Sequence, residues 1–237
     1  MPQLIAMIIV VVGAMIYMFQ TFGGTGDKIE GIAQKTSIIT EINNIKNGLK
    51  LAGRNGTIAK GNNDTEGEYN TLTGLAKVKY FAEQINEQLS KDSKGTARGL
   101  TFNSYSAISF GGDASNAEGT GGMLIQLVAN KSGQIPGIYV DLSKGNLKDN
   151  AGFLESQIAS DLENVAIIDR KAANTTFSST TPPAAGDLRT GTTLSEAEKR
   201  TPVASTTGSD SDGMFTIYFQ DFGSNEVVKT VTAVANP

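Results

Sequence analysis

The N-terminal stretch of the sequence constrains the fold most strongly, because it is long, apolar and uncharged. From Leu4 to Phe22 it reads LIAMIIVVVGAMIYMFQTF, and no acidic or basic residue occurs before Asp27. A helix of about 19 residues rises close to the ~30 Å thickness of a bilayer core. Its Leu, Ile, Val and Phe residues together favour membrane insertion by about 3–6 kcal/mol. The pattern therefore predicts a membrane-spanning helix.

A secretory signal peptide is the main alternative to a retained membrane helix. Signal peptides begin with Lys or Arg and end in a cleavage site of small residues. In this sequence the first basic residue is Lys28, and the residues after Phe22 read GGTGDK. We therefore expect either that the segment is retained or that a basic leader has been removed upstream of Met1.

A cluster of glycines follows the apolar run. Gly23, Gly24 and Gly26 lie close together, and each costs about 1 kcal/mol in a helix interior relative to Ala. We therefore expect a helix break at 23–27, with an unwound or extended backbone that lets the N-terminal rod stretch and re-orient. An ordinary loop after a membrane helix is the alternative interpretation.

A second helical pattern runs from about Lys28 to Ala52. Its apolar residues recur at steps of three and four and so line one face of a helix: Ile29, Ile32, Ile38, Ile39, Ile42, Ile45, Leu49 and Ala52. The opposite side is expected to carry Glu30, Lys35, Glu41, Asn44 and Lys46 to Lys50. This pattern is typical of a helix laid against a globular core, and Gly53 and Gly56 are expected to end it.

The remainder of the chain reads as a soluble head, so the predicted domains are a helical rod at 1–52 and a globular head at 53–237. Helical spacing predicts helices at 72–90 and 147–163, and apolar or alternating runs predict strands at 100–110, 123–129, 138–142, 165–168, 214–222 and 227–234. Polar and glycine-rich stretches predict loops at 53–71, 111–122 and 172–212. The expected fold class is α+β, in which the long N-terminal helix, broken at its glycines, packs on a mostly antiparallel sheet.

The composition excludes several kinds of chemistry. The chain contains no Cys and no His, so disulfides, Cys/His zinc sites and histidine acid–base catalysis are absent. A net charge of −4 without a basic cluster argues against nucleic acid as a partner. No spacing indicates a Ser/Lys or carboxylate pair, so we expect no enzyme, no catalytic residue and no cofactor. Asp210, Asp212 and Gly213 resemble the start of a calcium loop, but the other ligands are out of register, so a plain turn and no metal site are expected.

Two features are candidates for modification. Three asparagines stand in N-x-Thr sequons, namely Asn55, Asn63 and Asn174. They are glycan acceptors only in a host that has the machinery. The Ser/Thr-rich stretch at 175–211 is either a site for O-linked sugar or, as we expect, a flexible surface loop.

The N-terminal rod resembles that of a type IV pilin, the subunit of a type IV pilus. The match is carried by Met1-Pro2-Gln3-Leu4-Ile5, the apolar run to Phe22, the glycine break at 23–26 and the amphipathic continuation to Ala52. A Met at the start of the chain is similar to the type IVb branch of the family. The predicted order of strand, strand and helix around Ile138 to Glu163 is also similar to the heads of that branch.

The resemblance implies a structural subunit of an extracellular filament on the cell surface. In this family the N-terminal helix anchors the subunit in the inner membrane and then becomes the core of a helical filament, while the head faces outward. The residues implied in filament-core packing are Met1, Leu4, Ile5, Ile8, Ile9, Val12, Tyr17 and Phe19. The implied partners are identical subunits, the inner membrane before assembly and the pilus assembly machinery. Cell adhesion, motility, DNA uptake and conjugation are all compatible with such a subunit.

Two features depart from the family pattern. Family members usually carry a glutamate where this chain has Ile5, and most heads carry a C-terminal cysteine pair that is absent here. A filament nevertheless explains the rod physically, since an apolar helix that leaves lipid must be buried again, and Ala6, Gly13 and Ala14 allow close helix packing. The alternatives are a single-pass anchored protein with an extracytoplasmic binding domain and a secretion-system pseudopilin.

Overall fold

The computed structural model describes residues 30–64, 67–115, 121–171, 178–186, 193–194, 199–202 and 208–230. The chain divides into two compact units, Met1–Ser37 and Ile38–Pro237. The described part of the first unit, residues 30–37, is helical. In it the Thr36 hydroxyl donates a hydrogen bond to the Ile32 carbonyl at 2.9 Å. The Ile32 side chain is 62% exposed, so the predicted apolar face is not buried at this position.

Helix α1, described over residues 30–54, supplies one wall of the core in the second unit. Most of its predicted apolar residues in that unit are buried, namely Ile38, Ile42, Ile45, Leu49 and Ala52, whereas Ile39 is half-buried. The helix ends before Gly56, whose φ of 69° lies in the left-handed region that favours glycine. Gly53 is itself helical, so of the two glycines expected to end the helix only Gly56 does so.

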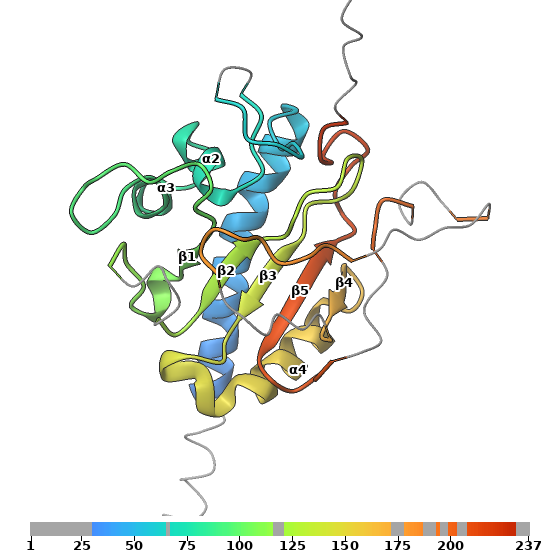
Figure 1. Ribbon diagram of the computed structural model, residues 1–237. Coiled ribbons are helices and arrows are strands. Elements are labelled where there is room, and N and C mark those ends of the chain that lie inside the picture. Colours follow the sequence, from blue (N-terminus) through green and yellow to red (C-terminus); the bar gives the residue numbers. More distant parts are fainter. Residues whose placement is uncertain are drawn as a thin grey trace, which may run out of the picture. The chain divides into compact units, whose positions relative to one another are not determined.

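Five strands form one sheet in the order β1-β2-β3-β5-β4. They are β1 (Tyr105–Ser106), β2 (Leu124–Leu127), β3 (Ile138–Asp141), β4 (Ala166–Asp169) and β5 (Met214–Phe219). All neighbouring pairs are antiparallel. Figure 1 shows α1 passing behind β2 and β3. The fold class is therefore α+β with an antiparallel sheet, as predicted.

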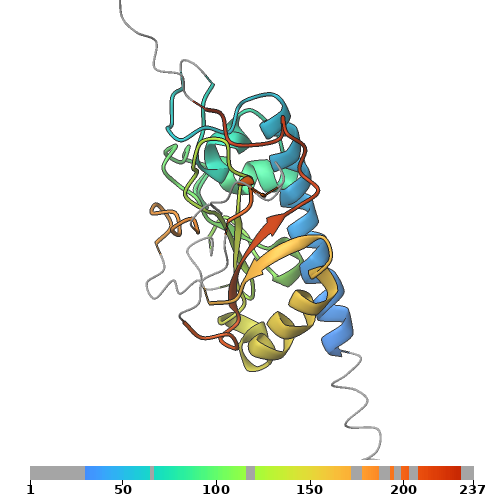
Figure 2. The same ribbon diagram turned by 90° about the vertical axis from the view of Figure 1, so that its right-hand side faces the viewer.

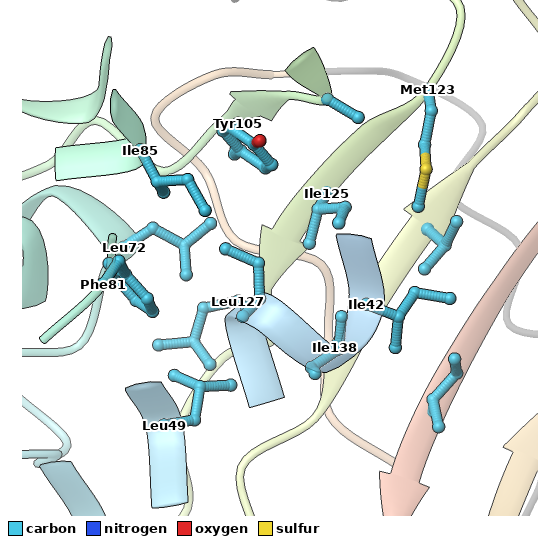
Figure 3. Packing of buried hydrophobic residues seen from close by; sticks show 14 of the residues in the cluster. Ile42, Leu49, Leu72, Phe81, Ile85, Tyr105, Met123, Ile125, Leu127 and Ile138 are labelled. Carbon is cyan, nitrogen blue, oxygen red and sulfur yellow. The ribbon is translucent and has the colours of Figure 1, made fainter. Parts of the chain in front are cut away.

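The core lies between α1 and the face of the sheet that α1 covers. Alternate strand residues point toward the helix, so that Ile125, Val140 and Phe215 form one buried row across the sheet. In Figure 3 the side chains of Ile42 and Leu49 from α1 lie among those of the strands. Apolar burial on this face is the main stabilising contribution, and a buried Leu or Ile typically contributes about 1.5–3 kcal/mol.

The helix predicted at 72–90 is wrong in its middle. The structure has two helices, α2 (Leu72–Lys77) and α3 (Glu83–Ser90), separated by a turn in which Lys79 has a φ of 63°. Phe81 enters the core after this turn, and the Asn86 amide donates a hydrogen bond to the Phe81 carbonyl at 2.6 Å. The packing of Phe81 in the core therefore interrupts the predicted helix at a place where the sequence has no Gly or Pro.

Two further elements differ from their predicted extents. The strand predicted at 100–110 is reduced to β1 and is followed by a 3₁₀ helix, η1 (Ile108–Phe110). The helix predicted at 147–163 consists of a 3₁₀ turn, η2 (Gly145–Asn150), and helix α4 (Ala151–Leu162). The remaining strand predictions at 123–129, 138–142, 165–168 and 214–222 are confirmed within a few residues.

One described stretch of the connection between β4 and β5, residues 178–186, crosses the sheet face opposite α1. We call it the strap. The Gln126 amide of β2 donates to the Ser178 carbonyl at 2.8 Å, and the Ala129 backbone N–H donates to the Pro183 carbonyl at 2.8 Å. In Figure 1 the strap, drawn in orange, runs in front of β2 and β3. The surface loop expected here is confirmed for the strap, and two of its backbone carbonyls accept hydrogen bonds from Gln126 and Ala129.

The strand predicted at 227–234 does not close the sheet in its described part. Lys229 forms an isolated parallel bridge with Ala59, and Val228 N–H donates to the Gln134 carbonyl at 2.9 Å. Residues 231–234 lie outside the described residues. Alternation of apolar residues indicates an extended backbone here but does not identify its partner.

Candidate functional site

The residues implied in filament packing lie outside the described part of the chain. Met1 to Phe19 and the glycine break at 23–26 precede residue 30, where the description begins, and Asn174 also falls outside it. None of the described helices has the length and apolar character required to span a bilayer. The predicted packing and the predicted helix break therefore stay predictions.

Two of the three sequon asparagines are described. Asn55 is exposed at the end of α1, and its amide donates a hydrogen bond to the Tyr80 hydroxyl at 3.2 Å. Thr57, the third residue of the same sequon, has its hydroxyl 2.7 Å from the Tyr80 hydroxyl. Asn63 is half-buried and its backbone pairs with that of Glu68. Asn55 is thus the more accessible of these two acceptors, and glycosylation stays a prediction.

The outward side of α1 carries a stripe of uncharged residues. We call it the neutral stripe, and it comprises Thr40, Asn43, Asn44, Asn47 and Leu51. All five are exposed, and Leu51 is 47% exposed. Between Glu30 and Arg54, no exposed position of the described helix carries a charge. A helix face that remains in water usually carries charged side chains.

Most residues of the neutral stripe have a low intrinsic propensity for the helix. Asn and Thr have lower helix propensity than Lys, Glu or Ala, because their short polar side chains compete for backbone hydrogen bonds or lose rotamer freedom. The same side chains form hydrogen bonds between helices that pack closely. The stripe is therefore better suited to contact with another surface than to solvent.

A row of basic residues borders the neutral stripe and binds the C-terminal loop. Lys46, Lys50 and Arg54 recur every four residues and so lie on one side of α1. Lys46 Nζ lies 2.8 Å from Asp221 Oδ2, and Lys50 Nζ lies 3.3 Å from the same atom. Arg54 pairs with Glu226, which Lys50 also approaches at 3.7 Å. We call this set the acid–base ladder.

The ladder shifts the titration of its two acids. Burial alone would raise the pKa of Asp221, but hydrogen bonds and charge from Lys46 and then Lys50 lower it below the usual value. Burial likewise opposes ionisation of Glu226, and its pKa is lowered by the Gly223 backbone N–H and by Arg54 and Lys50. Both carboxylates are therefore held in their ionised form.

Backbone packing fixes the same contact. A Cβ atom added at Gly53 would lie 2.9 Å from the carbonyl carbon of Glu226, so the loop passes directly over the helix at this position. Lys46 Nζ also lies 4.2 Å from the centroid of the Phe219 ring, at the end of β5. The C-terminal loop is thus held on α1 by steric fit, ion pairs and a cation–π contact.

Glu41 is buried, although the sequence pattern places it on the solvent side of α1. It is 3% exposed. Its carboxylate accepts hydrogen bonds from the Tyr105 hydroxyl at 2.9 Å and from the Ser109 backbone N–H at 2.8 Å. The prediction is wrong because these donors, which lie more than sixty residues away, satisfy the carboxylate inside the protein. Burial and the nearby Glu41 charge raise the pKa of Tyr105.

A second buried carboxylate, that of Glu155, contacts both ends of the connection between β4 and β5. Glu155 of α4 is fully buried and accepts from Arg170 Nε at 2.7 Å and from the Gly213 backbone N–H at 2.8 Å. Burial raises the pKa of Glu155, while these two donors oppose the rise. The backbone bends at 210–213, where Asp212 accepts a hydrogen bond from the Met214 N–H at 3.0 Å.

Tyr218 of β5 is a buried tyrosine whose hydroxyl contacts the strap. Burial raises the pKa of Tyr218 to about 12, and its hydroxyl accepts a hydrogen bond from the Gly186 N–H of the strap at 3.1 Å. Within the described residues no group of three or more acidic side chains is placed to hold a metal ion.

Sequence reasoning missed both the acid–base ladder and the buried Glu41. The spacing of Lys46, Lys50 and Arg54 was a usable signal for a basic row on one helix side. Nothing local identified its acidic partners, because Asp221 and Glu226 lie about 170 residues further along the chain.

Comparison with known proteins gave no match among protein-family models, curated proteins or solved structures.

Proposed function

We propose that the chain is the structural subunit of a type IV pilus-like extracellular filament, assembled by packing of its N-terminal helices. In this proposal the subunit is held in the inner membrane by residues 1–22 before assembly. The head domain, predicted at 53–237, faces outward, and the protein has no catalytic activity.

The observation that carries the proposal is the neutral stripe on α1. Upstream of it in the sequence lies an apolar run without charge. Asp27, Lys28, Glu30 and Lys35 separate the two, and the stripe from Thr40 to Leu51 is again without charge on the exposed side of the helix. Desolvating a charged helix side against a neighbouring subunit costs more than desolvating Asn and Thr side chains, which lose little where the neighbour supplies hydrogen-bond partners. The basic residues that flank the stripe are turned to the C-terminal loop by the acid–base ladder.

The ladder also bears on the missing cysteine pair. A filament head that withstands force benefits from a C-terminal segment that is fastened to its long helix. In this chain the fastening consists of ion pairs from Lys46, Lys50 and Arg54 and of close backbone packing at Gly53. The absence of cysteine is therefore compatible with a filament subunit.

Electron microscopy of material sheared from expressing cells tests the proposal. The expected result is filaments that contain the chain. Changing Asn44 and Asn47 together to Glu places two charges in the neutral stripe and is expected to abolish these filaments, while the membrane fraction still contains folded subunit. Gln84→Glu, on an exposed position of α3, adds a charge elsewhere and is the matched control that should assemble normally.

The other outcomes favour other functions. A parent chain that remains in the membrane fraction and never enters filaments would indicate a single-pass anchored protein with an extracytoplasmic binding domain. Filaments that stay short and remain in the cell envelope would indicate a secretion-system pseudopilin. Normal filaments from the Asn44/Asn47 variant would show that the stripe is not a subunit contact.

A further inference from the structure

An exposed basic turn lies between α2 and α3. It consists of Lys77, Val78 and Lys79, and we call it the basic knuckle. All three residues are exposed, Val78 by 43%, and no ion pair joins either lysine to another described residue. Lys79, with a φ of 63°, follows the C-cap of α2, at the position where glycine is usual. Glycine would favour this turn locally, so a lysine at this position indicates a role for its side chain.

An exposed acidic surface lies where α4 ends. It consists of Asp161, Glu163 and Val165, and we call it the acidic end. All three residues are exposed, Val165 by 44%, and Glu163 forms no ion pair with another described residue. A helix C-terminus carries partial negative charge and favours cations, but the last turn of α4 contains no basic residue. A cation supplied by another molecule would therefore stabilise the acidic end.

The two surfaces lie on opposite sides of the head. α2 packs on α3, and the Gln88 side chain of α3 donates to the Ser106 carbonyl of β1 at 2.9 Å. α4 packs on β4, and β1 and β4 are the two outermost strands of the described sheet. Figure 1 shows α2 and α3 to the left of the sheet and β4 to the right, and in Figure 2 β4 and α4 face the viewer.

We propose that the basic knuckle of one copy docks on the acidic end of the next copy. Two lysines then meet two carboxylates, and the exposed Val78 and Val165 are covered in the same contact. The opposite charges favour a second copy as the occupant, because every copy carries both halves of the contact. Since the two halves are different surfaces on opposite sides of one subunit, the contact is heterologous and continues from copy to copy.

The other charged groups beside these surfaces leave their signs unchanged. The groove next to the basic knuckle has a volume of about 520 Å³, and its charged residues are Lys77, Lys79, Lys91, Glu83 and Glu87, so bases outnumber acids. The groove next to the acidic end has a volume of about 350 Å³, and its charged residues are Glu163 and Arg170. Arg170 is bound to the buried Glu155 at 2.7 Å and does not neutralise the acidic end.

The contact is weak by itself. Exposed ion pairs contribute little, and stable protein pairs usually bury at least about 1,000 Å². The contact becomes effective where packed N-terminal helices already hold the heads side by side at high local concentration. In this respect the inference rests on the proposed filament, in which the contacts between successive subunits are heterologous as well.

Cysteine cross-linking tests the contact, and the chain has no cysteine of its own. A full-length chain with both Val78→Cys and Val165→Cys, treated with a short bismaleimide on expressing cells, is expected to give a ladder of covalent oligomers on a denaturing gel. Its two thiols lie on opposite sides of the head, so every link joins two chains. The matched control combines Val165→Cys with Asn225→Cys, an exposed position on the C-terminal loop, and is expected to give about tenfold less oligomer, because these thiols meet only by collision.

Charge reversal in the chain with Val78→Cys and Val165→Cys separates docking from random contact. Lys77→Glu with Lys79→Glu gives a chain with two acidic surfaces, and Asp161→Lys with Glu163→Lys gives a chain with two basic surfaces. Each reversed chain alone is expected to lose the ladder about tenfold through like-charge repulsion. Co-expression of the two reversed chains is expected to restore the ladder, which also shows that both are folded. A ladder no stronger than the control, unchanged by reversal, or not restored by co-expression would overturn the contact.

Microscopy of the same samples distinguishes the two proposals. Filaments without the ladder contradict the docking of knuckle on acidic end and leave the filament subunit intact. A charge-dependent ladder without filaments contradicts the filament subunit and supports the docking by itself.

Discussion

At the scale of single residues, Gly48 marks the closest approach of α1 to the turn before α3. A Cβ atom at this position would lie 2.3 Å from the Phe81 ring and 2.8 Å from the Tyr80 carbonyl oxygen. We expect Gly48→Ala to destabilise the head by about 1–3 kcal/mol through overpacking, in spite of the better helix propensity of Ala. Denaturant unfolding followed by circular dichroism measures this change.

The neighbouring Asn47 is the control for that substitution. It is exposed in the same turn of α1, so Asn47→Ala should leave stability unchanged or raise it by about 0.5 kcal/mol. A Gly48→Ala chain as stable as the Asn47→Ala chain would mean that the loop carrying Phe81 moves away at little cost.

The buried Glu41 gives a second prediction at this scale. Glu41→Ala removes the acceptor for the Tyr105 hydroxyl and for the Ser109 N–H, and leaves buried donors without a partner. We expect a loss of about 1–3 kcal/mol in unfolding free energy. Glu87→Ala, on an exposed position of α3, should change the same quantity by less than about 0.5 kcal/mol. Equal effects of the two substitutions would contradict a stabilising role for the buried carboxylate.

At the scale of elements, the acid–base ladder makes the joint between α1 and the C-terminal loop sensitive to acid. The pKa values of Asp221 and Glu226 are lowered in the folded protein. Their contribution is therefore complete above the unfolded pKa values of about 4 and is lost as the pH falls through the lowered folded values. Glu155 acts in the opposite sense, because its folded pKa is raised.

We therefore expect the parent chain to lose more stability between pH 6 and pH 3 than a chain carrying Asp221→Asn and Glu226→Gln. The comparison of the two chains removes the opposing contribution of Glu155, which both retain. Urea unfolding at several pH values measures the difference. Parallel stability curves for the two chains would show that the ladder contributes nothing to the joint.

The elements also show where local patterns stop being sufficient. The spacing of apolar residues predicted α1, which buries one face, and short apolar or alternating runs predicted the strands β2 to β5, most of whose residues are buried. It failed at 72–90, where the position of Phe81 in the core decides the break between α2 and α3. At the strap the composition predicted the loop but not its hydrogen bonds to the sheet, since polar residues form a loop equally well whether water or the sheet satisfies its backbone.

At the scale of the whole molecule, the predicted glycine break affects how far the proposed filament can stretch. If the segment containing Gly23, Gly24 and Gly26 is unwound in the filament, replacing all three with Ala favours a continuous helix by about 3 kcal/mol in total. We expect filaments of this variant to have a changed rise per subunit and a lower extensibility. Helical reconstruction and force measurements on single filaments test this, and unchanged values would remove the break from assembly.

The sequence by itself determined the features that depend on local composition. These are the charge-free apolar run, the glycine cluster that follows it, the apolar face of α1 and the exclusion of cysteine and histidine chemistry. Each follows from residue types within a short window, where solvation and helix propensity act directly. The proposed filament subunit rests mainly on these features.

Only the tertiary structure decided which polar groups are buried and what they contact. In the folded chain Glu41 is buried and accepts a hydrogen bond from Tyr105, and Lys46 and Lys50 form ion pairs with Asp221. The strap crosses the sheet and accepts a hydrogen bond from it. The tertiary structure also left β4 at an edge of the described sheet, because the described part of 227–234 pairs elsewhere. The physical reason is that a polar side chain is stable in the interior only with a partner of matching geometry, and in these cases the partner lies far away in the sequence.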